Sequence, residues 1–225
     1  MKVVIGLSGV KTSGKSTVAN IIKNILKDQV AESALADKLK NVCSDVFLIP
    51  RDHFDDQKLK EVPLEESRVL TISDINKIVE FFNVASKITP ETREKLHSIA
   101  GMVLKTPRQI AQIVGTEVLR ATGDEDIHCK NVKLNENTTI ISDIRFPNEF
   151  DYFNRLEDTF FLPLYIQRDA AEKDINENSH SSETSVFKFS DRCIKINNNN
   201  DLRDLENQIR INLLIRGYAL RQRNL

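Results

Sequence analysis

The stretch Val3-Val4-Ile5-Gly6-Leu7-Ser8-Gly9-Val10-Lys11-Thr12-Ser13-Gly14-Lys15-Ser16-Thr17 decides the fold of this chain. Its first five residues are mostly β-branched and apolar, which is typical of a buried strand. Residues 9–16 then follow the spacing GxxxxGK[ST]. Apolar residues recur three and four positions apart from Val18 to Leu26, which predicts a helix. A glycine-rich turn between a strand and a helix predicts a loop that binds phosphate.

Each residue type in this loop suits that chemistry. Gly9 and Gly14 permit the backbone conformations that aim successive N–H groups at phosphate oxygens. The N-terminus of the following helix adds a partial positive charge. Lys15 is expected to reach the β- and γ-phosphates, and the Ser16 hydroxyl is placed for Mg²⁺. We therefore expect the chain to bind a nucleotide, with ATP and Mg²⁺ as its cofactors.

The length and composition of the chain exclude several classes of protein. The chain has 225 residues, which suits one domain with a sizeable insertion. It is 40% hydrophobic with a net charge of −1, which argues against global disorder and against nucleic-acid binding through net charge. Three distant cysteines favour neither a disulfide framework nor a zinc site, and no apolar run is long enough to span a bilayer. We expect a soluble protein of a reducing compartment.

The remaining chain alternates between strand and helix patterns, which predicts an α/β fold with a parallel sheet covered on both faces. Ligands should then bind at the carboxyl ends of the strands. Residues 48–105 are charged, helix-prone and punctuated by proline, as expected of a helical insertion, and residues 168–190 are polar without periodicity, as expected of a mobile flap. The further strands are predicted at residues 33–36, 138–142, 160–166 and 193–196, and helices at 37–47 and from 202, capped by Asp201.

Residues 107–121 form a predicted helix with a polar stripe opposite its apolar face. The stripe consists of Arg108, Gln112, Gly115, Thr116 and Arg120. The two arginines can fork onto phosphate, and Gln112 can pair with a base edge. Glycine costs about 1 kcal/mol inside a helix, so its presence suits a close ligand or a close neighbouring backbone. A solvated helix face explains the pattern equally well.

Residues 142–149, Ser-Asp-Ile-Arg-Phe-Pro-Asn-Glu, follow a predicted buried strand. Asp143 should therefore emerge at the carboxyl edge of the sheet, near the phosphate loop, with Arg145 on the same side. Such an aspartate could bind a substrate hydroxyl, hold Mg²⁺ through water or orient a nucleophilic phosphate. A structural ion pair of Arg145 with Asp143 or Glu149 is the alternative. Arg168, at a strand end, is a candidate for stacking on adenine or clamping phosphate, although a surface arginine is the default.

Several motifs together resemble a known family, the deoxynucleoside monophosphate kinases encoded by bacteriophages and other large DNA viruses. The resemblance covers residues 3 to about 210 and is also carried by stretches 52–61 and 180–183. Its main motifs, in order, are Gly9-x4-Gly14-Lys15-Ser16, Ala36-Asp37-x-Leu39-Lys40, Arg108-x3-Gln112-x2-Gly115-Thr116-Glu117-x2-Arg120 and Asp143-x-Arg145-Phe146-Pro147-Asn148-Glu149.

The resemblance implies a three-layer P-loop kinase fold with a central parallel five-stranded sheet, and transfer of the ATP γ-phosphate to a dNMP. It implies a core of residues 1–36, 137–167 and 191–215, a substrate-binding insertion at 37–136, a lid at 168–190 and a basic tail at 216–225. Carried over by position, ATP and Mg²⁺ are bound by Ser13, Lys15, Ser16 and Thr17, with Ser16 on the metal. Gly9, Gly14 and Arg168 complete the predicted ATP site on the chemistry given above. The dNMP is bound by Asp37, Lys40, Arg108, Gln112, Gly115, Thr116, Arg120, Asp143, Arg145 and Glu149, of which Arg108, Asp143 and Arg145 act with Lys15 in catalysis.

Two departures from the family pattern stand out. Relatives commonly have aspartate where this chain has Ser16, which restores the common hydroxyl of such loops and should be harmless. Tryptophan is usual where this chain has His128, so base stacking and substrate preference are open. Other small-molecule P-loop kinases, of the phosphomevalonate or dephospho-CoA type, are the main alternative; a regulatory nucleotide-binding ATPase and a nucleic-acid-dependent ATPase are others. We expect a cytoplasmic enzyme, in the host cytoplasm if viral, with no membrane or nucleic-acid partner; homodimerisation is left open.

Overall fold

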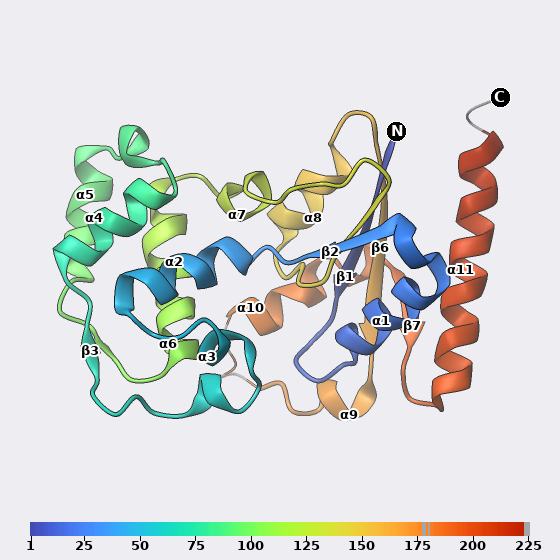
Figure 1. The fold of residues 1–225 in the computed structure, drawn as a ribbon, viewed down its shortest axis with the longest axis horizontal. Coiled ribbons are helices and arrows are strands. Elements are labelled where there is room, and N and C mark those ends of the chain that lie inside the picture. Colours follow the sequence, from blue (N-terminus) through green and yellow to red (C-terminus); the bar gives the residue numbers. More distant parts are fainter. Residues whose placement is uncertain (177–178, 180, 223–225) are drawn as a thin grey trace. The chain divides into compact units, whose positions relative to one another are not determined.

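The structure is a computed structural model that describes residues 1–176, 179 and 181–222. The chain forms two compact units, one made of Met1–Leu35 and Val132–Leu225 and the other of Ala36–Asn131. Figure 1 colours both along the sequence. Within the described ranges, no helix combines the length and apolar composition that crossing a membrane requires.

The first unit is built on a five-stranded sheet in the order β2-β5-β1-β6-β7, in which every neighbouring pair is parallel. The predicted α/β class with a central parallel sheet of five strands is thus confirmed. Its strands are β1 (Lys2–Ser8), β2 (Val30–Ser33), β5 (Thr138–Ile141), β6 (Thr159–Gln167) and β7 (Ile194–Asn197).

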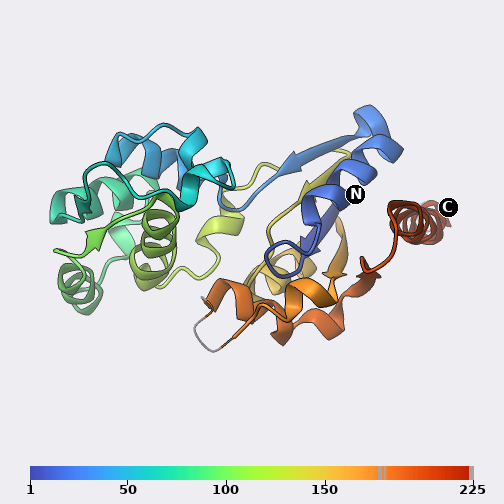
Figure 2. The same ribbon diagram turned by 90° about the horizontal axis from the view of Figure 1, so that it is seen from below.

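Helices cover both faces of this sheet, as Figure 2 shows from below. On one face, α1 (Lys15–Leu26) and α11 (Leu202–Gln222) pack their apolar residues against Ile5, Leu7 and Ile140. On the other face, α8 (Pro147–Asn154) places Phe150 and Phe153 against the ring of Phe161. Two further short helices of this unit are α9 (Asp169–Glu172) and α10 (Ser181–Thr184).

Three boundaries in this unit differ from the sequence predictions. The second strand ends at Ser33 rather than spanning 33–36, because it is defined by its pairing with β5, where Ser33 lies opposite Ile141. Helix α11 continues to Gln222, so residues 216–222 have helical backbone instead of forming a separate tail. In segment 168–190, Val186 and Phe189 are buried, so its second half packs as part of the unit. Asp201 caps α11 as predicted, accepting a hydrogen bond from the Asp204 nitrogen at 2.8 Å.

The second unit is mostly helical, as predicted, around a separate apolar core. Thr71 and Asp74 cap one helix reciprocally, and Thr89 followed by Pro90 begins the next. A short antiparallel pair of strands, β3 (Arg68–Val69) and β4 (Val103–Leu104), was not predicted. The helices are α2 (Asp37–Phe47), α3 (Asp52–Asp55), α4 (Ile72–Phe81), α5 (Pro90–Ser98), α6 (Pro107–Gln112) and α7 (Ile127–Lys130).

The predicted helix over residues 107–121 is not a single α-helix. It begins as α6, continues as a π-helix at Ile113–Leu119 and ends in a 3₁₀ turn at Arg120–Thr122. Periodicity could not reveal this change, because polar residues four apart stay on similar sides of either helix. π-helical turns are rare and often accompany functional sites.

Candidate functional site

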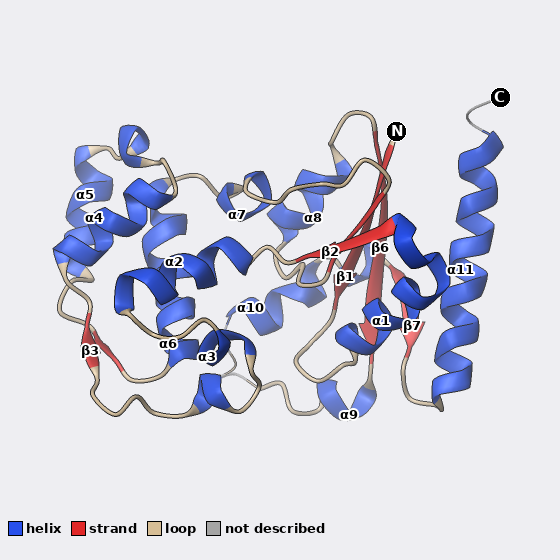
Figure 3. Ribbon diagram, viewed as in Figure 1, coloured by secondary structure: helices blue, strands red, loops and turns tan. Residues whose placement is uncertain are grey.

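The loops that follow the parallel strands gather at one edge of the sheet, because parallel strands share the direction of their carboxyl ends. Strand β1 leads into the glycine loop, β5 into Asp143, β6 into Arg168 and β7 into Asn198. Figure 3 shows these loops in tan beyond the red strands. This topology brings together residues as far apart in the sequence as Ser13 and Asn198, which are 185 positions apart.

The glycine loop has an unusual backbone conformation at three of its residues. Gly9, Thr12 and Gly14 all have positive φ, at 141°, 62° and 103°. This conformation is uncommon for a β-branched residue such as Thr12. The Lys15 ammonium curls over the loop and donates hydrogen bonds of 2.7 Å to the carbonyl oxygens of Gly9 and Val10. The Lys15 side chain is therefore hydrogen-bonded to the backbone of the loop that precedes it.

The hydroxyl of Ser13 is an exception among buried polar groups. Ser13 is 0% exposed, and its Oγ has no hydrogen-bond partner among the described residues. A Cβ added to Gly9 would lie 2.7 Å from that Oγ, so glycine is needed for the loop to close. A buried hydroxyl without a partner costs about 1–3 kcal/mol. A ligand that reaches into the loop and accepts this hydrogen bond would recover that free energy.

The first turn of α1 supplies the other predicted phosphate and metal contacts. Ser16 and Thr17 are exposed there, and the first main-chain bond of the helix joins the Val18 nitrogen to the Gly14 carbonyl. The N-terminus of an α-helix is in general a favourable place for an anion, because its first N–H groups precede the main-chain bonding of the helix. The described residues hold no cluster of three acidic, histidine or cysteine side chains suited to a metal. A hydroxyl at Ser16 nevertheless fits Mg²⁺, which is commonly held by one or two protein oxygens, phosphates and water.

Two side chains donate hydrogen bonds to backbone carbonyls of the loop. Arg168 donates to the Thr12 carbonyl at 3.2 Å, and Asn198 donates to the Ser13 carbonyl at 2.7 Å. Arg168 was predicted to bind the nucleotide, and its guanidinium contacts the loop itself. Asn198 was missed, because Asn197–Asn200 looked like a simple turn. Only its position directly after a β-strand hinted at a role.

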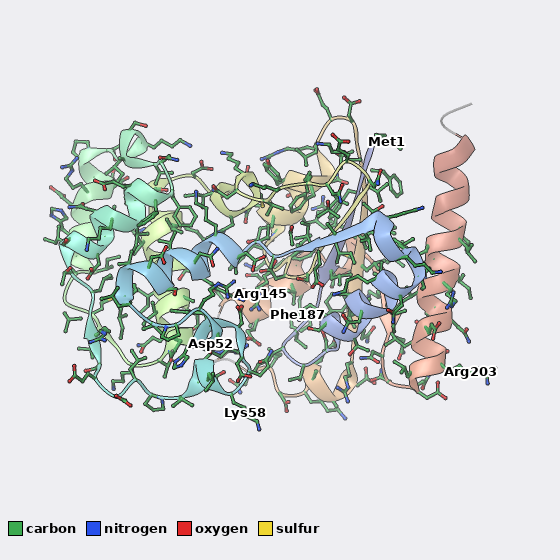
Figure 4. All side chains as sticks on the ribbon, viewed as in Figure 1. Met1, Asp52, Lys58, Arg145, Phe187 and Arg203 are labelled. Carbon is green, nitrogen blue, oxygen red and sulfur yellow. The ribbon has the colours of Figure 1, made fainter. Side chains whose placement is uncertain are left out.

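Asp143 and Arg145 both lie in the connection between β5 and α8, where Figure 4 labels Arg145. The Asp143 carboxylate accepts a 2.6 Å hydrogen bond from the backbone nitrogen of Leu35, which follows β2. Glu149 is buried, and its Oε2 accepts hydrogen bonds from the backbone nitrogens of Arg145 (2.8 Å) and Phe146 (3.0 Å). Glu149 therefore caps α8 and orients the backbone at Arg145, which is a structural role that the predicted substrate contact did not include.

In the second unit, the predicted polar stripe divides into different environments. Arg108 Nε lies 2.6 Å from a Glu61 carboxylate oxygen, with the arginine side chain 21% exposed. Gln112 and Arg120 are half-buried. Thr116 directs its hydroxyl to the Gln112 carbonyl at 2.6 Å. The stripe is therefore neither fully solvated nor fully buried.

Gly115 faces the core of the second unit rather than a ligand. A Cβ on Gly115 would lie 2.9 Å from Leu39 Cδ2 and 4.0 Å from His128 Nε2. His128 is buried too, and its Nε2 lies 3.4 Å from the Gly115 carbonyl oxygen. Burial lowers the pKa of His128 to about 4, with Arg120 contributing in the same direction. His128 thus packs in this unit's core, with Phe82 edge-on to its ring.

Asp37 and Lys40 are part of an ion-pair network within the second unit. Arg51 contacts Asp37 at 3.1 Å and also pairs with Asp55, which Lys40 contacts at 2.9 Å. These pairs outweigh partial burial and lower the pKa of Asp55. In the His180–Glu183 stretch, His180 lies outside the described residues.

Comparison of the sequence with protein-family models gave no match, and comparison with curated protein sequences gave none.

Proposed function

We propose that this chain is an ATP-dependent deoxynucleoside monophosphate kinase, which transfers the γ-phosphate of ATP to a dNMP and releases ADP and a dNDP. The observation that carries the proposal is the glycine loop between β1 and α1. It combines three positive-φ residues, a lysine folded over the loop and a buried Ser13 hydroxyl that lacks a partner among the described residues. All three features suit a bound polyphosphate.

The proposed roles in the first unit follow from chemistry. Lys15 neutralises negative charge on the transferred phosphoryl group, and the Ser13 hydroxyl and N–H groups of the loop bind phosphate oxygens. Mg²⁺, held by Ser16, would supply charge neutralisation between the β- and γ-phosphates. Arg145 binds the phosphate of the acceptor, and Asp143 positions that acceptor. The acceptor oxygen is already anionic, so positioning and electrostatics suffice without a strong general base.

The second unit supports a nucleotide acceptor through its donor set. Arg108 can fork onto phosphate, and the Gln112 amide has both a donor and an acceptor for a base edge. An isoprenoid acceptor has no base edge for that amide to pair with. This choice of side chains favours a monophosphate with a base over the acceptors of other small-molecule kinases.

A substrate panel tests the proposal. ADP release from ATP–Mg²⁺ would be measured with each dNMP, each ribonucleoside monophosphate and phosphomevalonate. We expect turnover with one or more dNMPs, and none in the Lys15→Ala variant with unchanged circular dichroism. The matched control is Lys23→Ala on the same helix, because Lys23 lies eight residues beyond Lys15 and pairs with Glu32 at 2.7 Å. Turnover confined to phosphomevalonate, or silence on the whole panel, would reject the proposal.

A further inference from the structure

Asn198 stands out because one side chain reaches into the glycine loop from the far end of the chain. Its Nδ2 donates a 2.7 Å hydrogen bond to the Ser13 carbonyl. A Cβ on Gly14 would lie 2.3 Å from the same nitrogen, so only glycine at this position leaves room for the amide. The contact therefore depends both on the Asn198 amide and on the absence of a side chain at Gly14.

Asn198 is itself held in place by the ends of two strands and a helix. Its backbone nitrogen donates to the Gln167 carbonyl at 2.8 Å. Its neighbour Asn197 exchanges two 2.9 Å hydrogen bonds with the Gln208 side chain on α11. The next residue, Asn199, accepts a 2.8 Å hydrogen bond from the Asp169 nitrogen at the start of α9. Residues 197–199 are thus each hydrogen-bonded to a neighbouring element.

The direction of this hydrogen bond matters because a trans peptide points its C=O and N–H groups in opposite directions. Fixing the Ser13 carbonyl toward Asn198 turns the Gly14 N–H away from Asn198. Arg168 donates a hydrogen bond to the preceding carbonyl, that of Thr12. Thr12 itself has the left-handed backbone conformation that β-branched residues rarely adopt. Arg168 and Asn198 therefore bond two consecutive carbonyls. The Ser13 N–H, which shares a peptide with the Thr12 carbonyl, donates to the Val10 carbonyl at 3.3 Å, so the N–H that Asn198 orients is that of Gly14.

We propose that Asn198 is a positioning residue for phosphate binding: by holding the Ser13 carbonyl, it fixes the peptide that carries the Gly14 N–H and so keeps that N–H oriented for a polyphosphate. This inference rests on the proposed nucleotide binding and extends it to a residue outside the loop. Asn198 acts through the loop and does not itself touch the nucleotide. Its substitution should weaken the binding of any polyphosphate, with or without a base.

Calorimetric titration of ATP–Mg²⁺ and of inorganic tripolyphosphate–Mg²⁺ tests this inference. Asn198→Ala should bind both ligands about tenfold more weakly than the wild type, the effect expected from losing one well-placed hydrogen bond. Asn198→Asp has the same shape but puts an oxygen against the Ser13 carbonyl, so it should lose at least as much. This second variant also covers the case in which the alanine variant fails to fold.

Asn200→Ala is the matched control, because the Asn200 side chain bonds Asp204 at 3.0 Å on the helix that follows. It should bind both ligands as the wild type does. Unchanged binding in folded Asn198→Ala and Asn198→Asp would overturn the inference, as would weakened binding of ATP with tripolyphosphate unaffected, since that pattern indicates contact with the nucleoside. If the wild type binds neither ligand, the proposed function itself fails, which is a different result from these.

Discussion

The carboxylate of Asp143 accepts a 2.6 Å hydrogen bond from the backbone nitrogen of Leu35, so a side chain that follows β5 holds the chain where it leaves the neighbouring strand β2. Asp143 therefore has a structural contact as well as its proposed place at the acceptor. The two roles make different demands on the side chain. Accepting a hydrogen bond requires only an oxygen, whereas electrostatic positioning of an acceptor requires the negative charge.

Asp143→Asn separates these roles, because the amide oxygen can still accept from Leu35. We expect the melting temperature to change little and the turnover of dNMP to fall about a hundredfold. Asp143→Ala should lose both turnover and stability. Thermal unfolding and the ADP-release assay on both variants provide the measurement. Full activity in Asp143→Asn would leave the residue with the structural role alone.

Arg145→Ala should reduce turnover on dNMP about a hundredfold, since the role proposed for Arg145 is to contact charge that develops in the transition state. Arg145→Lys should recover only part of this loss, because an ammonium lacks the planar fork that binds two phosphate oxygens. Arg210→Ala is the control, since Arg210 pairs with Glu206 on the exposed surface of α11. Steady-state kinetics with varied dNMP is the measurement, and near-wild-type turnover of Arg145→Ala would remove the assigned role.

Gly115→Ala should destabilise the protein although alanine is the better helix former. The new methyl group would meet Leu39 at 2.9 Å in the core of the second unit, and overpacking of this kind costs about 1–3 kcal/mol. In a Leu39→Ala background the clash is absent, so the same substitution should be neutral or stabilising by up to about 1 kcal/mol. Urea unfolding of the four proteins measures both effects. A stabilised single variant would contradict this packing.

His128 should make folding stability depend on pH. Its pKa in the folded protein is about 4, below its ordinary value of 6.5, because burial disfavours the charged ring. The unfolded chain therefore binds more protons between these values, so the free energy of unfolding should fall as pH drops from about 6.5 toward 4. The loss attributable to His128 is about 3 kcal/mol.

The His128→Gln variant isolates the contribution of His128 to the pH dependence of stability, because an amide can still donate to the Gly115 carbonyl but does not titrate in this range. Urea unfolding at pH 7 and pH 4 should show a smaller loss of stability in the variant than in the wild type. Equal losses in the two proteins would mean that His128 is not held neutral in the core. The carboxylates titrate in both proteins, so their effect cancels in the comparison.

Local patterns in the sequence predicted the features that depend on neighbouring residues. The turn between β1 and α1, strands β1, β5, β6 and β7 and the Asp201 cap could be predicted, because each rests on periodicity or on a spacing of a few residues. The parallel sheet followed from the alternation of strands and helices. These features need no knowledge of which distant segments meet.

Contacts between distant segments were decided by the tertiary structure alone. Asn198 meets Ser13 across 185 positions, and Asp143 meets Leu35 across 108. Leu39 lies where a Cβ on Gly115 would point, and this contact explains the glycine. A hydrogen-bond donor or a glycine looks the same in the sequence whether it faces solvent, a ligand or another helix. The sequence by itself determined which chemical groups this protein carries and its class of fold, whereas only the folded chain decided which of those groups support one another, because that depends on distances set by packing.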